Sequence, residues 1–171
     1  MIALGEKGVL PRGAIKNKRL SKADILAALA QIDASLPLLL DAFLHKCQAA
    51  GFRAVTNKSL MIKAAIPDFG EVNFGTIFPT GKLQTNYISD SSERIGDMRI
   101  ASEYLDSVAA LLEGATVRRD GKSWTWRVEV FGELPAIAQI LTRGDDWLAL
   151  MRTARHRFAE LAAGEMLMQS T

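Results

Sequence analysis

Cysteine and histidine are both scarce in this sequence. Cys47 is the only cysteine among 171 residues, so the chain cannot form an internal disulfide, and a reducing cytoplasm is the expected location. The helical, apolar surroundings of Cys47 favour a small core residue over a reactive thiol. The two histidines, His45 and His156, fall on different predicted helices without the spacing of metal ligands. We therefore expect neither a metal nor another cofactor.

Long apolar runs are missing too. The longest, from Leu36 to Leu40, is far shorter than the ~20 residues that span a bilayer. The opening residues, Met-Ile-Ala-Leu-Gly-Glu-Lys-Gly, lack the apolar segment of a secretory signal. On both grounds we expect no association with a membrane.

The common catalytic signatures do not occur. The chain contains no H-E-x-x-H, G-x-S-x-G or G-x-G-x-x-G motif and no Walker A loop. Pro67-Asp68 followed by Asp120-Gly121-Lys122 imitates the signature of a metal-dependent nuclease family, whose chemistry needs two carboxylates on adjacent strands. Both aspartates fall in predicted turns, where they would hold a metal poorly. No catalytic residue is assigned, and a non-catalytic role is favoured while an enzyme stays an open alternative.

The composition that remains is that of an ordinary globular protein. Hydrophobic residues make up 49% and charged residues 23% of the chain, close to the average for soluble domains. The net charge is only +2, yet residues 1–22 hold six basic residues against one acidic residue. We predict a basic N-terminal arm over 1–21, a single domain over 22–165 and a C-terminal tail over 166–171.

The periodicity of apolar residues predicts an α+β fold. Ser21 and Asp24 resemble a capping box that opens a helix over 22–34, and Pro37 marks the first turn of a second helix over 36–50. Alternation predicts strands over 60–66, 72–78 and 82–88, and further helices are expected over 98–113, over 135–142 and from Asp145 onward. The predicted architecture is an N-terminal helical part and an antiparallel sheet of about five strands, with helices packed on one face.

The first predicted hairpin turns at Thr80-Gly81. A two-residue loop pairs Phe78 with Leu83 and Thr76 with Thr85, whereas a three-residue loop pairs Phe78 with Lys82. We favour the two-residue loop because its cross-strand pairs are chemically better matched.

A second tight hairpin is predicted at Asp120-Gly121, where it brings Val117 opposite Trp124. Trp124 and Trp126 would then share a strand face, either as core residues or as a platform on which bases stack. The polar stretch over 89–97 is expected to be a loop.

Three predicted surfaces carry groups suited to binding. The arm offers cations that contact phosphates without reading sequence: Arg12, Lys16, Lys18 and Arg19. One sheet face offers amides and a lysine, which suit base edges or peptide groups: Asn73, Lys82, Gln84 and Asn86. The last helix places Arg152 and Arg155 three residues apart on one face. The alternative for each surface is a solvated face without a ligand.

The order of these elements resembles that of small uncharacterised bacterial domains that accompany predicted restriction and other DNA-processing proteins. The resemblance covers roughly residues 38–160, and its carriers are Gly51, Ser59-Leu60, Gly75, Gly81-Lys82-Leu83, Tyr104, Trp124 and Trp147. It implies a non-enzymatic module near nucleic acid and supplies no catalytic residue.

Together these observations predict an accessory nucleic-acid-associated binding module. The alternative is a protein-interaction or assembly subunit, in which the arm and the apolar tail at Met166-Leu167-Met168 dock onto a partner. Under that alternative the partner is an acidic protein or a second copy of the chain.

Overall fold

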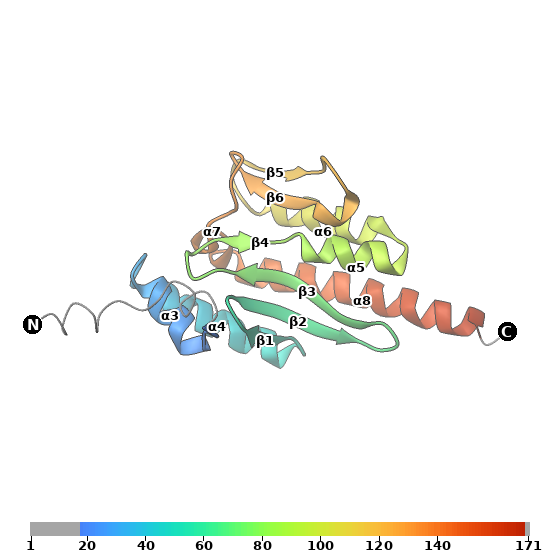
Figure 1. Ribbon diagram of the computed structural model, residues 1–171, viewed down its shortest axis with the longest axis horizontal. Helices are drawn as coiled ribbons and strands as arrows, with labels where there is room; N and C mark the ends of the chain where they lie inside the picture. The colour runs from blue at the N-terminus through green and yellow to red at the C-terminus, as the bar shows by residue number, and fades with distance from the viewer. Residues whose placement is uncertain (1–17, 170–171) are drawn as a thin grey trace, which may run out of the picture.

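The computed structural model describes residues 18–169, which form an α+β fold with helices before and after an antiparallel sheet (Figure 1). The first half comprises α3 (Lys22–Ala30), α4 (Leu36–Ala49), β1 (Arg53–Thr56), β2 (Leu60–Ile66), β3 (Gly70–Ile77) and β4 (Leu83–Gln84). The second half comprises α5 (Tyr87–Ile95), α6 (Met98–Ala110), β5 (Ala115–Arg118), the 3-10 turn η1 (Ser123–Thr125), β6 (Arg127–Val130), α7 (Ile137–Leu141) and α8 (Gly144–Gln169). The α+β prediction is confirmed.

The predicted capping signals position the first two helices. The Ser21 hydroxyl accepts a hydrogen bond from the Asp24 backbone N–H at 3.1 Å, and the Asp24 carboxylate accepts one from the Ser21 N–H at 2.8 Å. The Ser21 backbone N–H, and after it the Ser21 hydroxyl, stabilise the charged carboxylate and lower the pKa of Asp24. Pro37 lies in the first turn of α4, as predicted.

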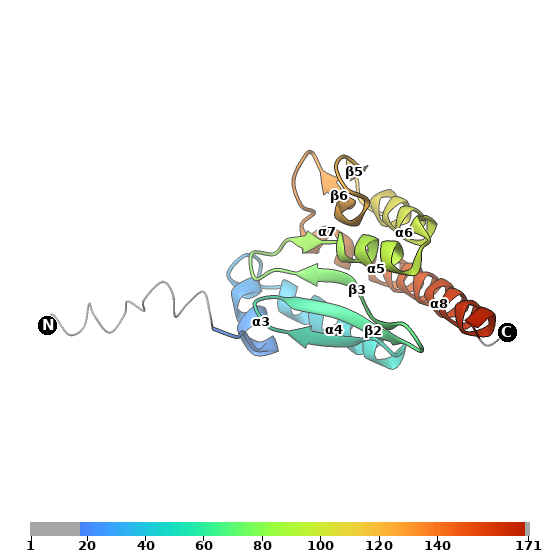
Figure 2. The same ribbon diagram turned by 45° about the vertical axis from the view of Figure 1, so that its right-hand side comes forward.

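The helices α3, α4 and α8 lie on one side of the sheet, and no helix of residues 18–169 covers the other side, which faces the viewer (Figures 1 and 2). Side chains of β2 alternate between these sides, and the buried set is Leu60, Ile62, Ala64 and Ile66. The sheet order is β1-β2-β3-β4, while β5 and β6 form a separate pair. The expected sheet of about five strands is therefore divided into four and two, because α5 and α6 intervene between β4 and β5.

A β-bulge in β3 changes which of its residues face the helices. Lys63 pairs with Asn73, but Ile62 pairs with Gly75, so Phe74 is the extra residue. Predicted alternation placed Thr76 on the same face as Phe74. The structure instead turns Gly75 and Ile77 inward opposite Ile62 and Leu60, and pairs Thr76 with Met61 and Gln84 on the uncovered side.

Side chains satisfy the backbone groups that the bulge releases. The Gly75 N–H donates to the Asn73 side-chain oxygen at 2.9 Å, and the buried Tyr104 hydroxyl donates to the Phe74 carbonyl at 2.8 Å. Trp147 Nε1–H in turn donates to the Tyr104 oxygen at 2.8 Å. Burial raises the pKa of Tyr104, so this hydroxyl keeps its proton at any pH near neutrality. One polar chain thus joins α8, α6 and β3.

Gly75 leaves the space that the Trp147 ring occupies. A Cβ at this position would stand 2.9 Å from Trp147 Cζ2 and 3.2 Å from Leu83 Cδ1. The Trp147 ring also stacks on Phe43 of α4, with centroids 4.9 Å apart. The sheet, α4 and α8 therefore meet at this one indole.

The favoured register of the first hairpin is wrong by one residue. Phe78 N–H donates to the Lys82 carbonyl at 2.9 Å, and Thr76 pairs with Gln84 rather than with Thr85. The turn is the three-residue loop, in which Gly81 N–H donates back to the Phe78 carbonyl at 2.9 Å. Gly81 has φ of +82°, the left-handed conformation that closes such loops.

The stretch predicted as a loop over 89–97 is mostly helix α5. Its serines suggest a polar loop, yet Ser89 and Ser92 are fully buried. The Ser89 hydroxyl donates to the Trp126 carbonyl at 3.0 Å, and the Ser92 hydroxyl accepts from the Ala101 N–H at 2.9 Å. Partners far along the chain therefore make these hydroxyls compatible with a packed helix.

The second hairpin is wider than predicted. Val117 pairs with Val128, not with Trp124, and the intervening residues form a loop that contains η1. Ser123 bonds Glu93 of α5 at 2.9 Å, and the Arg119 guanidinium lies 5.4 Å from the Trp126 ring centre. These contacts hold the 122–126 segment against α5 instead of along β5.

The last helix follows its prediction over most of its length. Trp147, Met151, Ala154 and Phe158 are buried as expected, and Ala162 rather than Leu161 completes the buried stripe. No helix in the part of the chain described by the structure is both long enough and apolar enough to cross a membrane.

Gly75→Ala is expected to destabilise the protein by about 1–3 kcal/mol, because the new methyl group overlaps the Trp147 ring. Chemical denaturation measures the change. Gly164→Ala is the matched control: it lies in α8 with open space around its Cβ position and is expected to stabilise by about 0.5–1 kcal/mol. Equal effects of the two substitutions would contradict this packing.

Tyr104→Phe is expected to cost about 1–3 kcal/mol, because the Phe74 carbonyl and the Trp147 N–H both lose their buried partner. The free energy of unfolding again reports the effect. Tyr87→Phe removes the same hydroxyl from a side chain that is 45% exposed, and it should change stability by less than about 0.5 kcal/mol. A neutral Tyr104→Phe would rule out the proposed importance of the polar chain.

Candidate functional site

The N-terminal cations fall partly within the described part of the chain. Arg12 and Lys16 lie outside it. Lys18 and Arg19 are exposed, and the next residue, Leu20, donates its N–H to the Asn57 carbonyl at 2.6 Å. This bond anchors the end of the arm at the β1–β2 turn, beside exposed Lys58.

We define Lys18, Arg19 and Lys58 as the turn cluster. No carboxylate of residues 18–169 forms an ion pair with any of the three, although the charge of Lys18 contributes to the lowered pKa of Asp24. Lys58 was not among the residues predicted from the sequence. Its position in a short polar turn was the only sequence signal, and the backbone bond between Leu20 and Asn57 is what brings it to the arm.

The predicted polar sheet face is only partly available. Asn73 is occupied by the bulge, where it accepts from Gly75 N–H and donates to the Thr76 hydroxyl at 2.9 Å. Lys82 approaches Glu133 at 4.0 Å. Asn86 precedes α5, and its side-chain oxygen is buried without a hydrogen bond. Gln84 pairs with Thr76. These residues do not assemble one open set of donors and acceptors.

The two predicted arginines of α8 have different surroundings. Arg152 is exposed, whereas Arg155 is half-buried and reaches the end of α4. Its Nη1 donates to the Ala50 carbonyl at 2.6 Å, and its guanidinium lies 4.3 Å from the Phe52 ring centre. The contact caps the carbonyl end of α4, where a cation is favourable. Burial, and then the charge of Arg152, lower the pKa of Arg155.

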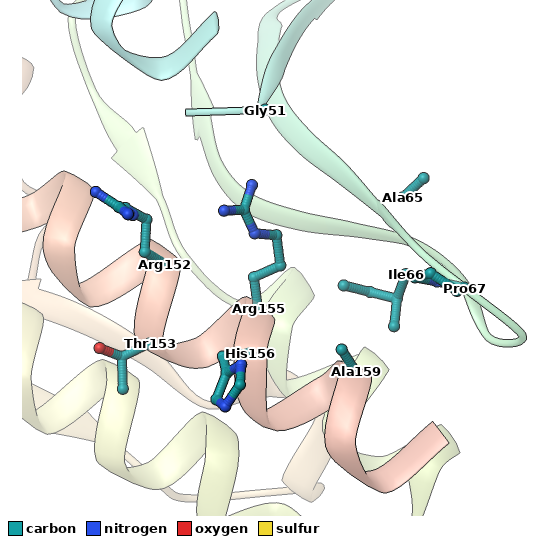
Figure 3. A pocket seen from close by; sticks show the side chains of 9 residues that line it. All are labelled: Gly51, Ala65, Ile66, Pro67, Arg152, Thr153, Arg155, His156 and Ala159. Atoms are coloured by element: carbon teal, nitrogen blue, oxygen red, sulfur yellow. The ribbon is translucent and has the colours of Figure 1, made fainter. Parts of the chain in front are cut away.

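Both arginines line an open groove of about 650 Å³ between α8, the end of β2 and the end of α4 (Figure 3). The lining residues are Gly51, Ala65, Ile66, Pro67, Arg152, Thr153, Arg155, His156 and Ala159. In Figure 3 the Arg155 side chain points toward Gly51 and the Arg152 side chain projects to one side of it. We call this the α8 groove.

The lining of the α8 groove contains no aspartate or glutamate. Glu160 stands nearby and binds His156 at 3.0 Å. The Thr153 hydroxyl is directed to the Ala149 carbonyl at 3.1 Å, within its own helix. The two guanidinium groups are therefore the main charges that face the groove.

Unpaired arginines are the exception in this fold. Among the arginines that the structure describes, eight form an ion pair with a carboxylate: Arg53, Arg94, Arg99, Arg118, Arg119, Arg127, Arg143 and Arg157. Three do not. Arg19 belongs to the turn cluster, and Arg152 and Arg155 share the α8 groove.

The geometry of the described residues supports neither a metal-dependent nuclease site nor a reactive thiol at Cys47. Residues 18–169 contain no group of three or more His, Cys, Asp or Glu side chains placed to hold a metal. Asp120 pairs with Arg118 at 2.7 Å, and Asp68 lies in a separate turn with φ of +65°. Burial raises the pKa of Cys47 to about 12, so its thiol is unreactive near neutral pH.

The tryptophan pair does not form the predicted strand face. Trp124 is 42% exposed in η1, and Trp126 is half-buried beneath Arg119. The two indoles therefore differ in environment, and neither lines the α8 groove.

Comparisons of the chain with known protein families, with curated proteins and with solved structures found no match. The resemblance to bacterial accessory domains therefore stays a prediction, and the function is argued from the site alone.

Proposed function

We propose that this chain is an accessory nucleic-acid-associated binding module that works by contacting the phosphate backbone. The observation that supports the proposal is the distribution of ion pairs. Arginines elsewhere on the folded surface have carboxylate partners, while the turn cluster and the α8 groove keep cations without them. Cations left without an internal partner suit an external anion.

The spacing of the two cationic places favours a polymer over a small anion. The turn cluster lies at the start of β2 and the α8 groove at its end. At roughly 3.3 Å per residue, the 7 residues of β2 separate them by about 20 Å. A DNA strand carries a phosphate at about every 3.4 Å of helix axis, so one segment can contact both places.

The binding is proposed to be independent of base sequence and to take place in the cytoplasm. The cationic places offer charge and forked N–H donors, which hold phosphates but do not distinguish bases. The amides expected to read base edges are poorly available, because Asn73 is bonded within the bulge and the side-chain oxygen of Asn86 is buried.

Salt dependence tests the proposal. The wild-type protein should be retained on heparin and on DNA at low salt, and its affinity should fall steeply as salt rises. Replacing Lys18, Arg19 and Lys58 with Ala is expected to lower the slope of log K against log salt by about 0.9 for each phosphate that the variant no longer neutralises. Fluorescence anisotropy with a labelled oligonucleotide measures that slope.

The control removes the same charge from paired positions. Lys46, Arg99 and Arg143 are exposed and each binds an aspartate, so their replacement with Ala should leave the slope unchanged. Absence of any retention of the wild-type protein at low salt would defeat the proposal.

An assembly subunit is the second candidate function, and one exposed apolar corner favours it. Ile32, which follows α3, and Leu38 and Leu39, in the first turn of α4, are 55%, 77% and 45% exposed. Side chains of this kind gather at protein interfaces. Under this alternative the corner meets a protein partner or a second copy of the chain.

Light scattering tests this second function. If the corner joins two copies, the wild-type protein should have the mass of an oligomer, and Leu38→Ser with Leu39→Ser should return it to a monomer. Both positions are exposed, so the double variant should keep its thermal stability. A wild-type protein that stays monomeric at high concentration counts against self-assembly.

A further inference from the structure

We infer that the α8 groove is a binding site for a single phosphate group of a nucleic-acid backbone, with Arg155 as its fixed donor and Arg152 as its mobile one. The inference rests on the proposed function and adds to it the place, the residues and the chemistry of one contact. It begins with the half-buried charge of Arg155.

Arg155 is a cation that is partly removed from water, and no carboxylate of residues 18–169 pairs with it. Its guanidinium lies against the Phe52 ring and the Ala50 carbonyl, whereas the two other half-buried arginines of residues 18–169, Arg127 and Arg157, each bind a glutamate. A neutral carbonyl and an aromatic face compensate a desolvated charge only in part. An anion in the groove supplies the missing compensation.

The Arg155 side chain is also held in place before any ligand arrives. One N–H bonds the Ala50 carbonyl at 2.6 Å, and the ring of Phe52 supports the guanidinium plane at 4.3 Å. The other guanidinium N–H groups donate to no acceptor within residues 18–169. A guanidinium fixed at one edge retains a second edge whose spacing matches two phosphate oxygens.

Arg152 supplies a second cation from the same groove. It precedes Arg155 by three residues on α8, and its exposed side chain carries no ion pair within the described chain. The mutual repulsion of the two cations contributes to the lowered pKa of Arg155. An anion that contacts both removes this repulsion.

The rest of the groove explains why the ligand is a backbone phosphate and not a base. The remaining surface comes largely from Ala65, Ile66, Pro67 and Ala159, which offer no ring on which a base could stack. The one aromatic ring among the lining residues, His156, is bound to Glu160 at 3.0 Å. Such a groove holds the backbone and leaves the bases outside. Binding at this site should therefore be equal for oligonucleotides of different sequence.

The experiment compares Arg152→Ala with Arg143→Ala. Both arginines are exposed residues at or beside α8 and both changes remove one positive charge, but Arg143 is bound to Asp146 at 2.8 Å. Anisotropy is measured over a range of salt with labelled single strands of about 16 nucleotides, one of thymine only and one of mixed sequence. Arg152→Ala should lower the salt slope by about 0.7 with both strands, and Arg143→Ala should not.

A second variant tests the shape of the donor. Arg155→Lys keeps the charge but loses the forked edge, so it should weaken binding about tenfold while the number of cations is unchanged. Its melting temperature is recorded beside the affinity, because the variant also alters the cap on α4. Arg152 does not contact the end of α4, so Arg152→Ala keeps the test valid if Arg155→Lys unfolds.

Competition identifies the anion. Inorganic pyrophosphate should displace the labelled strand from the wild-type protein at lower concentration than from Arg152→Ala. Polyglutamate that competes as well as unlabelled DNA at equal charge would overturn the assignment to phosphate. Equal salt slopes for Arg152→Ala and Arg143→Ala would overturn the inference and leave the proposed function standing. A wild-type protein that binds neither strand would overturn both.

Discussion

The hydrogen bonds that run from Trp147 through Tyr104 to the Phe74 carbonyl hold the helices on the sheet. They end at the bulge in β3, where an unpaired carbonyl would otherwise be buried. Gly75, the residue after the bulge, admits the Trp147 ring against the strand. The bulge, the tyrosine and the tryptophan therefore depend on one another, and the position of α8 follows from them.

The position of α8 in turn determines the groove. Trp147 and Phe158 are buried in the same helix, and Arg155, lying between them on its flank, is carried to the carbonyl end of α4. There the arginine caps Ala50 and covers Phe52. One side chain thus links α8 to the end of α4 and to Phe52, the residue before β1. The same side chain provides the half-buried charge of the groove, so fold and proposed binding share a residue.

The pattern of ion pairs distinguishes this groove from the rest of the surface. An exposed ion pair adds little stability. It nevertheless neutralises its cation, which is then less able to bind an external anion. The fold neutralises most of its arginines in this way. Among residues 18–169, the cations without such a partner are the turn cluster, the two arginines of the α8 groove and the isolated Lys122. Only the first two places gather more than one such cation.

Local sequence signals were sufficient to predict most helices and strands and the fold class. The Ser21 cap, the turn glycines and the alternation in β2 depend on near neighbours, and helix periodicity identified α8 and its pair Arg152 and Arg155. The bulge, the hairpin registers and helix α5 were not predictable in this way, since their polar groups are satisfied by residues 9 to 43 positions away. The same holds for the site. The spacing in the sequence places two arginines on one face of α8, but only packing against α4 leaves Arg155 half-buried without an acidic partner among the described residues. Burial and ion pairing could not be predicted because they are properties of segments that the fold brings together in space.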